Sequence, residues 1–521
     1  MLEPGWENAA IYAIPSHAER IGLVGPFSMQ ARLLYAAIHP LADVAVVESL
    51  EALEREAAQK PFQCVVVWSQ GRHDREKLLG RIVASICPGG VVLLLAANPR
   101  YWRRLQSLLT QGASEAEDVS PERWTAWGAA QGLLCSNVRP LVGNEPVPEA
   151  ALLARALAEK TPLEWLAAPV YLWCGVKTRR LPPQMVVQTL LISRIASDTV
   201  RVYEPDRALA ALPGVDTISS LDEVKLLPQE DARQKIFVWQ RSRLTKKEGP
   251  AKQKALLQRG YVPITEIDDD PMYWPEHPQE EFITFRSSLA VQTSTEPLAA
   301  YLRQFNPFVR FFPNQLAWLP PWKRRVPAGS VRIFFGAFNR EADWKPILPA
   351  LNALLTQWGG KVHMQVLYDE AFYKALQTPY KTFEPLCPYE RYHEVVRQAD
   401  VALLPLNDTR FNRMKSDLKF LQCAAHGVAV LASPTVYAES ICEGETGFLF
   451  ATPEEFSRKL ECLVLDAERR RRMAEQAYGW VRERRMLWQH YRTRYAWYME
   501  LAGRRQELVA ALRQRLPDMF E

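Results

Sequence analysis

Residues 399–432 read ADVALLPLNDTRFNRMKSDLKFLQCAAHGVAVLA, and this stretch decides the fold of the C-terminal half of the chain. The apolar run that ends at Pro405 predicts a buried strand, and Val428–Ala432 predicts a second one. Between them, a polar loop leads into a segment with helical spacing that stops at Gly427, and glycine commonly ends a helix. A strand, a helix and a strand in this order indicate a parallel sheet covered by helices.

The same alternation extends through the chain in three parts. The C-terminal part has two further predicted strands, at Val331–Phe335 and His363–Val366. For the middle part we predict strands at Val200–Tyr203, Ile236–Trp239, Val262–Ile267 and Leu289–Thr293, with helices at Pro250–Arg259 and Glu296–Gln304. For the first part we predict strands at Ile21–Val24, Val44–Val47, Cys64–Trp68 and Val91–Ala96. An α/β fold is therefore expected throughout.

Two segments separate the three parts. The Pro-rich stretch Leu319–Pro327 is typical of an extended, stiff connector. An Ala-rich helical segment, Pro146–Glu164, precedes a strand at Ala168–Trp173 that could belong to either side. Because single cores stop growing at about 250–300 residues, a chain of 521 residues needs two or three domains. We predict domains at 1–150, 165–325 and 326–521.

Composition limits the class of protein. The apolar fraction of 48% supplies buried cores, and the longest apolar run, Val91–Ala97, is far shorter than the about 20 residues of a membrane span. The eight cysteines are scattered without a CxxC pair, and the net charge of +5 demands no nucleic-acid partner. We therefore expect a cytoplasmic protein without a transmembrane segment and without nucleic acid, and leave peripheral membrane contact and oligomeric state open.

The end of the chain is rich in arginine and aromatic residues at helical spacing. From the Arg469–Arg472 run to Trp497, these residues predict a packed amphipathic helix with a solvated basic face. An RNA-binding or membrane-surface helix is the alternative.

Two stretches of the C-terminal part suit an anion. The strand at Val331–Phe335 runs into a glycine turn, and a helix with Asp343 as its N-cap would follow, so that Arg340 and Lys345 lie near backbone N–H groups that attract phosphate. Two solvated surface cations are the alternative. Ahead of the second helix lies Lys415, the strongest single candidate for an anion site.

The residues after Lys415 leave two questions open. Ser416 or Asp417 can cap the helix that stops at Gly427. Lys419, one turn after Lys415, is either a second phosphate ligand or an exposed helix lysine.

Together, these motifs and the later Tyr437 and Glu445–Leu449 resemble glycosyltransferase family 4. The resemblance implies a GT-B-like pair of Rossmann-like domains, here preceded by an additional N-terminal α/β domain. It implies a glycosyltransferase that moves a sugar from a nucleotide-diphosphate sugar to a hydroxyl acceptor on a glycan or protein, with retention and without a metal or other cofactor. It assigns catalytic roles to Arg340, Lys345 and Lys415, and donor-binding roles to Gly336, Asn339, Asn412, Ser416, Asp417, Lys419, Gln422 and Tyr437.

This chain departs from the family pattern at two positions. Many members carry two glutamates eight residues apart, and the corresponding residues here are Met414 and Gln422. An amide can still bond a ribose diol, but without the charge that strengthens carboxylate bonds. A catalytically inactive GT-B-like binding or scaffold protein is therefore the alternative.

Polar residues also end two strands of the middle part. Gln240 and Arg241 follow one strand, and Asp268 and Asp269 follow another. Because strand ends of parallel sheets face the ligand crevice, we expect these four residues on the acceptor side. A structural turn and a metal site are the alternatives for the acidic residues.

The first domain weakly resembles a class I methyltransferase core. A turn at Gly25, an acidic residue at Glu48 and the turn Pro88–Gly90 carry this resemblance. Pro26 and Phe27 crowd the turn where glycines would let backbone approach a cofactor. We predict a degenerate domain, with a bifunctional methyltransferase and glycosyltransferase as a second alternative.

Overall fold

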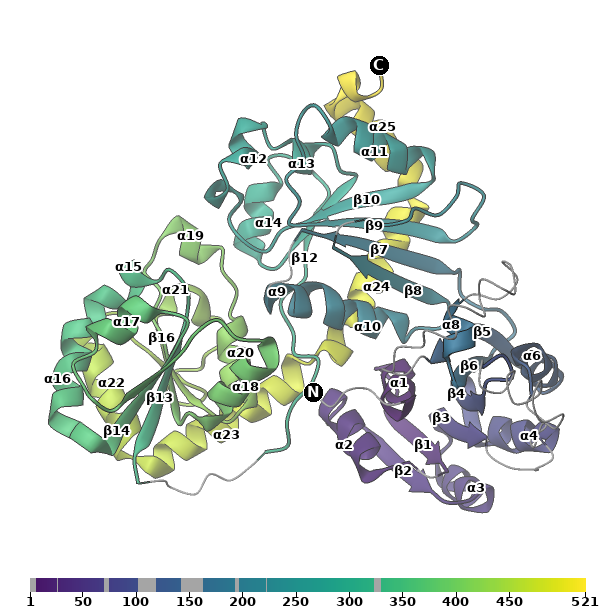
Figure 1. The fold of residues 1–521 in the computed structure, drawn as a ribbon, viewed down its shortest axis with the longest axis horizontal. Coiled ribbons are helices and arrows are strands. Elements are labelled where there is room, and N and C mark those ends of the chain that lie inside the picture. Colours follow the sequence, from purple (N-terminus) through teal and green to yellow (C-terminus); the bar gives the residue numbers. More distant parts are fainter. Residues whose placement is uncertain are drawn as a thin grey trace. The chain divides into compact units, whose positions relative to one another are not determined.

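The computed structural model describes residues 6–25, 27–69, 75–101, 119–141, 163–192, 196–221, 223–322 and 329–521. The chain forms two compact units: Met1–Val186 with Asp206–Thr217, and Val187–Pro205 with Ile218–Glu521 (Figure 1). Three expectations fall outside the described residues: the crowding at Pro26, most of the Ala-rich segment before Glu164, and residues 323–327 of the connector.

The first unit is built on a six-stranded sheet in the order β2-β1-β3-β4-β6-β5. Four parallel strands confirm the four that the sequence predicted: β1 (Arg20–Val24), β2 (Asp43–Val47), β3 (Phe62–Ser69) and β4 (Ile86–Ala97). The undecided strand is β6 (Val170–Lys177), which pairs antiparallel with β4 and with β5 (Leu133–Leu141). The first sheet therefore extends past residue 165.

Helices cover both faces of this sheet: α1 (Trp6–Ala13), α2 (Met29–Ile38), α3 (Leu50–Gln59), α4 (Arg75–Ser85), α6 (Pro121–Ala130) and α8 (Leu163–Ala167). The central strands β3 and β4 are near-continuous apolar runs because side chains on both of their faces are buried. After β1, Gly25 has a φ of 117°, and a Cβ atom there would lie 3.2 Å from Trp68 Cβ. The backbone itself thus requires glycine at this turn.

The next sheet, most of which belongs to the second unit, has the order β12-β11-β10-β9-β7-β8. Its strands are β7 (Met185–Leu191), β8 (Val215–Ser220), β9 (Gln234–Gln240), β10 (Tyr261–Glu266), β11 (Ala290–Thr293) and β12 (Val309–Phe311). The helices include α11 (Gly249–Gln258) and α14 (Glu296–Leu302). Three of the four predicted strands and both predicted helices are confirmed here. We call this part the middle lobe.

The fourth predicted strand of the middle lobe is wrong. Thr199–Tyr203 forms a π-helical turn between α9 (Ala196–Asp198) and α10 (Glu204–Ala210). The β-branched residues Val200 and Val202 favour a strand, but tertiary contacts override that preference. The deciding contact is the side chain of Arg201, which is buried among the strand ends.

The C-terminal lobe carries a third sheet, in the order β15-β14-β13-β16-β17-β18, and all its pairs are parallel. The four predicted strands are confirmed as β13 (Val331–Gly336), β14 (Val362–Leu367), β16 (Val401–Leu404) and β17 (Ala429–Ala432), beside β15 (Lys381–Glu384) and β18 (Phe448–Leu449). Its helices are α15 (Glu341–Trp344), α16 (Leu348–Trp358), α17 (Glu370–Ala375), α18 (Tyr389–Gln398), α19 (Arg410–Arg413), α20 (Leu418–Ala425), α21 (Pro434–Tyr437) and α22 (Pro453–Leu465).

The basic terminal stretch is helical, as predicted, but it forms more than one helix. These are α23 (Ala467–Arg484), α24 (Leu487–Gly503) and α25 (Arg505–Arg515). Helix α24 returns to the middle lobe, where the Tyr498 hydroxyl donates to Gln292 Oε1 at 2.9 Å (Figure 1). Arg494 of this helix is buried rather than solvated.

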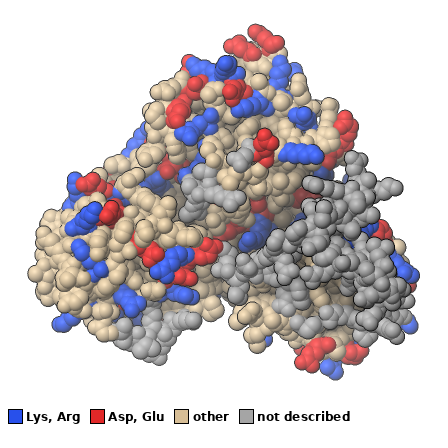
Figure 2. Space-filling model, viewed as in Figure 1, with Lys and Arg blue, Asp and Glu red and all other residues tan. Residues whose placement is uncertain are grey.

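The predicted fold class is therefore confirmed: a GT-B-like pair of Rossmann-like domains in the second unit, and an additional N-terminal α/β domain. On the face shown in Figure 2, basic and acidic side chains are interspersed, in line with a net charge of +5 over 521 residues. Within the described part of the chain, no helix is both long and apolar enough to cross a bilayer.

A buried ion pair ties the middle lobe together. Arg201 and Glu266 are 2% and 1% exposed, and Arg201 Nε donates to Glu266 Oε1 at 2.6 Å. The other guanidinium nitrogens of Arg201 donate to the carbonyls of Phe312 and Thr293 and to Asn314 Oδ1, at 2.7, 3.0 and 2.9 Å. One side chain thus joins the ends of β10, β11 and β12.

Replacing Arg201 by Met should lower the free energy of unfolding by about 3 kcal/mol, because buried Glu266 loses its closest basic partner and keeps only the longer ion pair with Arg494, at 3.8 Å. Urea unfolding of the variant measures the change. As a control, Arg303→Ala removes an exposed pair with Glu296 and should cost less than about 1 kcal/mol. Similar losses in the two variants would contradict the role of Arg201.

Candidate functional site

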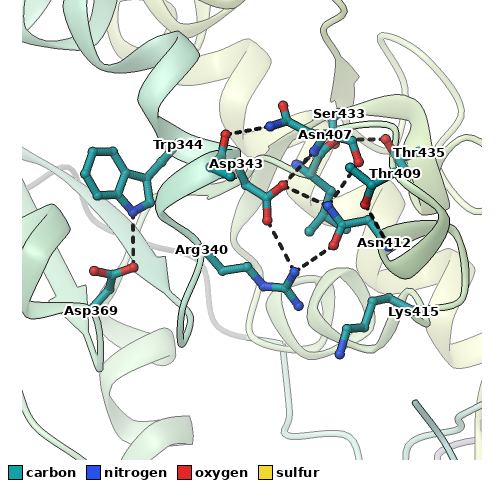
Figure 3. A network of polar contacts seen from close by, with 12 residues as sticks. Arg340, Asp343, Trp344, Asp369, Asn407, Thr409, Asn412, Lys415, Ser433 and Thr435 are labelled. Carbon is teal, nitrogen blue, oxygen red and sulfur yellow. Dashed lines mark hydrogen bonds and ion pairs between the residues drawn. The ribbon is translucent and has the colours of Figure 1, made fainter. Parts of the chain in front are cut away.

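Three cations meet at the carboxyl ends of the strands of the C-terminal lobe. Arg340 follows β13, Lys415 lies between α19 and α20, and Lys419 is in the first turn of α20. Figure 3 shows the side-chain ends of Arg340 and Lys415 close to one another. Parallel sheets place the residues that follow different strands along one edge, so residues far apart in sequence converge here.

Asp343 holds Arg340 in place (Figure 3). Arg340 Nη1 donates to Asp343 Oδ2 at 3.2 Å and to Asn412 Oδ1 at 2.7 Å. The second carboxylate oxygen of Asp343 accepts from the Asn407 backbone N–H and from Asn412 Nδ2, both at 2.8 Å. The prediction that Asp343 is an N-cap is therefore wrong: it lies inside α15, and its carboxylate is used to join the loops after β13 and β16.

The two lysines are held from different sides. Lys419 Nζ donates to the carbonyl of Gly336 at 2.5 Å, which ties α20 to the end of β13. Lys415 Nζ lies 4.3 Å from the centre of the Phe411 ring and donates to Asp269 Oδ1, from the middle lobe, at 2.5 Å. The exposed-lysine interpretation of Lys419 is thus wrong, because this side chain is half-buried and faces the sheet edge.

Burial and repulsion among the three cations lower the pKa values of both lysines. Burial, together with the nearby charges of Arg340 and Lys415, lowers the pKa of Lys419 to about 7. Burial also lowers the pKa of Lys415, although Asp269 opposes that effect. A bound dianion would favour the charged form of both lysines, so the arrangement suits a phosphate group.

The helix α20 is not capped as expected. Asp417 is its N-cap residue, but no hydrogen bond caps the helix through its side chain. The Asp417 carboxylate instead accepts from Arg485 Nη1 and Nη2 at 2.5 and 2.9 Å and from Ser440 Oγ at 2.5 Å. Ser416 Oγ accepts from Asn314 Nδ2 at 2.8 Å. These two residues fasten α20 to the turn between α23 and α24 and to Asn314, which lies after β12 in the segment that connects the two lobes; we call it the crossing segment.

Lys345 is not brought to the cluster. Its side chain is 62% exposed and pairs with Glu341 one turn earlier at 2.9 Å. Asn339 is also exposed, with a φ of 50°, in the loop between Gly336 and Arg340.

The remaining predicted donor residues are buried near the strand ends. Asn412 bonds Arg340 and Asp343, as described above, and Tyr437 is buried in α21. Gln422 is 4% exposed, and its Nε2 donates to the Tyr389 hydroxyl at 3.0 Å.

On the middle lobe, each residue of the acidic triplet pairs with a different cation. Asp268 binds Arg241 at 2.5 Å, Asp269 binds Lys415 at 2.5 Å, and Asp270 binds Arg410 at 3.2 Å. Among the described residues, no group of three or more potential metal-ligating side chains converges. Neighbouring Gln240 is fully buried at the end of β9.

Three residues of the site are not among those predicted from the sequence. Phe411 packs beneath Lys415, Arg410 reaches Asp270, and Arg485 clamps Asp417. The aromatic and basic character of Thr409–Arg413 was visible in the sequence. The partners of these residues, however, come from distant segments and could not be paired without the fold.

This geometry can be compared with known proteins. Residues 347–500 match a family model described as glycosyl transferase-like. The matched residues include most of the C-terminal lobe, and both lysines of the cluster lie among them. No curated protein sequence matches the chain.

Several solved structures are similar to the chain. A glycosyltransferase from Rickettsia africae is 11% identical with a TM-score of 0.44, covering 61% of this chain and 98% of that one. Anabaena Alr3699/HepE in complex with UDP and glucose is 11% identical with a TM-score of 0.43, covering 61% and 100%. S. aureus TarM is 8% identical with a TM-score of 0.37, covering 50% and 55%, so this chain spans about half of TarM.

The pKa of Lys419 predicts a pH dependence. Its amine is charged below pH 7 and loses its proton as the pH rises, so the affinity for inorganic pyrophosphate should fall. Between pH 6 and pH 8, the wild type should lose affinity by about tenfold relative to Lys419→Gln, which has no proton to lose. Calorimetry at both pH values measures this ratio. The same pH profile in both proteins would refute the assignment.

Proposed function

We propose that this chain is a glycosyltransferase that moves a sugar from a nucleotide-diphosphate sugar to a hydroxyl group of a glycan or protein. The observation that carries the proposal is the cluster of Arg340, Lys415 and Lys419 at the strand ends of the glycosyl transferase-like lobe. A diphosphate is the anion that such a donor presents, and cations at strand ends are where α/β domains bind nucleotides.

The reaction transfers the sugar from a phosphate oxygen to the acceptor oxygen. The bond between the anomeric carbon and the terminal phosphate oxygen breaks, and the acceptor oxygen bonds to that carbon and releases its proton to water. The departing nucleoside diphosphate gains a negative charge, which Arg340, Lys415 and Lys419 stabilise in a site partly screened from water. The family resemblance implies that the transfer retains the anomeric configuration.

The proposal changes one catalytic assignment. Arg340 and Lys415 keep the roles that the resemblance implies, whereas Lys419 takes the place of the exposed Lys345. Gly336, Asn339 and Ser416 contribute backbone groups near the diphosphate. The amide of Gln422, oriented by Tyr389, takes the ribose hydroxyls.

The Asp269 carboxylate bonds Lys415 at the place where we expect a donor phosphate. The carboxylate and a donor phosphate would compete for the same amine, so the donor must displace Asp269. The neighbouring residue Asp268 pairs with Arg241, and we assign this pair to the acceptor side.

Replacing Asp269 by Asn should therefore tighten binding of a nucleoside diphosphate, by about tenfold if the ion pair contributes about 1.4 kcal/mol to the competition. Calorimetry with UDP, GDP, TDP and CMP identifies the nucleotide and measures the change. Asp408→Asn, which makes the same change in the exposed pair with Arg413, is the control and should leave affinity unchanged. Weaker binding by the Asp269 variant would contradict the competition.

The central variant is Lys415→Ala, with Lys345→Ala as its matched control. Losing Lys415 removes a buried charge-assisted contact to the diphosphate and should reduce both nucleotide affinity and sugar transfer by about 10²-fold or more. The exposed Lys345 should change either quantity by less than about threefold. Release of nucleoside diphosphate in the presence of acceptor measures transfer.

The alternative, an inactive GT-B-like binding protein, predicts a different result. It allows nucleotide binding to depend on Lys415 but gives no sugar transfer and no donor hydrolysis with any nucleotide sugar. If wild type binds no nucleotide at millimolar concentration, the glycosyltransferase proposal itself fails.

A further inference from the structure

A second recess adjoins the cation cluster within the second unit. Its volume is ≈ 820 Å³, which is within the range of ligand pockets. Its walls come from Arg303 and residues within 294–297 and 309–315 of the middle lobe, 413–417 and 434–440 of the C-terminal lobe, and 484–494 around the start of α24. Lys415 and Ser416 line it, so the recess opens directly onto the position that we assign to the donor phosphate.

The charge of this recess is positive. Seven Lys or Arg residues line it against three Asp or Glu residues. Two of the arginines are neutralised within the wall, by Glu296 and Asp417. Arg310 and Arg413 pair outside the wall with Glu500 and Asp408, which are 47% and 64% exposed, so these pairs are screened by water and weak. Arg494 and Lys415 also have acidic partners outside the wall, Glu266 at 3.8 Å and Asp269 at 2.5 Å.

Two polar side chains on the wall lack hydrogen-bond partners. Ser294 Oγ and Gln315 Oε1 are buried atoms with no partner among the described residues, and the two residues are only 2% and 8% exposed. Leaving a buried polar atom unpaired costs about 1–3 kcal/mol, so such atoms usually have a ligand or water to bond. A hydroxyl can donate to Gln315 Oε1 and can also pair with Ser294 Oγ.

We propose that this recess binds the acceptor, and that the acceptor is an anionic polyhydroxylated chain, namely a glycan or polyol polymer bearing carboxylate or phosphate groups. This proposal rests on the proposed glycosyltransferase function. The basic wall attracts the anionic groups, whereas Ser294 and Gln315 bond the hydroxyls. Because Lys415 lies at the edge of the recess, one acceptor hydroxyl reaches the anomeric carbon of a donor held at the cation cluster.

The test measures acceptor binding without any donor, by calorimetry on the full chain. The probes are hexagalacturonate, which carries carboxylates, a hexamer of glycerol phosphate, and the neutral maltohexaose. At least one anionic probe should bind saturably, and at least about tenfold more tightly than maltohexaose. The stronger of the two anionic probes identifies the acidic group of the acceptor.

Two variants on the wall and one outside it locate the site. Arg484→Glu should weaken the anionic probe by about tenfold, and Ser294→Val should weaken it by about fivefold. Arg472→Glu makes the same charge change on an exposed position of α23 away from the recess and should leave binding unchanged. Thermal unfolding of each variant confirms that it folds.

Two outcomes would overturn the proposal: no anionic probe binds, or Arg484→Glu and Arg472→Glu weaken binding equally, which indicates non-specific attraction. Neither outcome touches nucleotide binding at Lys415, since no donor is present. Failure of the acceptor proposal and failure of the donor proposal are therefore distinguishable.

Discussion

The buried pair of Arg201 and Glu266 is the interaction on which both sites depend. Arg201 fixes the ends of three strands of the middle lobe and also bonds Asn314 Oδ1 in the crossing segment. Asn314 in turn donates to Ser416, immediately after Lys415. The buried Arg201 guanidinium thus fixes the position of the N-terminus of α20, through Asn314 and Ser416, because a buried charge needs all of its hydrogen bonds.

The cation cluster is costly to assemble without a ligand. Burying Lys419 beside Arg340 and Lys415 lowers its pKa to about 7, which shows that the folded chain disfavours its charge. The carbonyl of Gly336 and the carboxylate of Asp269 offset part of that cost. A diphosphate would offset more of it than a single carboxylate can, and on this difference we base the proposal that the cluster binds a donor rather than forming only a structural ion pair.

Much of the fold could be predicted from the sequence, and less of the site. Strands such as Val91–Ala96 were found because buried parallel strands are continuous apolar runs. The segment around Arg201 was mistaken for a strand because its valines dominate locally, whereas its conformation is set by partners more than 60 residues away. The sequence offered both Lys345 and Lys419 as phosphate ligands. Only the structure shows that Lys419 points to the end of β13 whereas Lys345 points into solvent. The acceptor recess has walls from five distant segments, so no local pattern could reveal it.

The most direct measurement is a crystal structure of the chain with the nucleoside diphosphate that binds most tightly. The account predicts diphosphate oxygens within hydrogen-bonding distance of Lys415 Nζ and Lys419 Nζ, with Asp269 no longer bonded to Lys415. A nucleotide bound elsewhere, or one bound while the Asp269–Lys415 pair stays intact, would contradict the assignment of this cluster as the donor site.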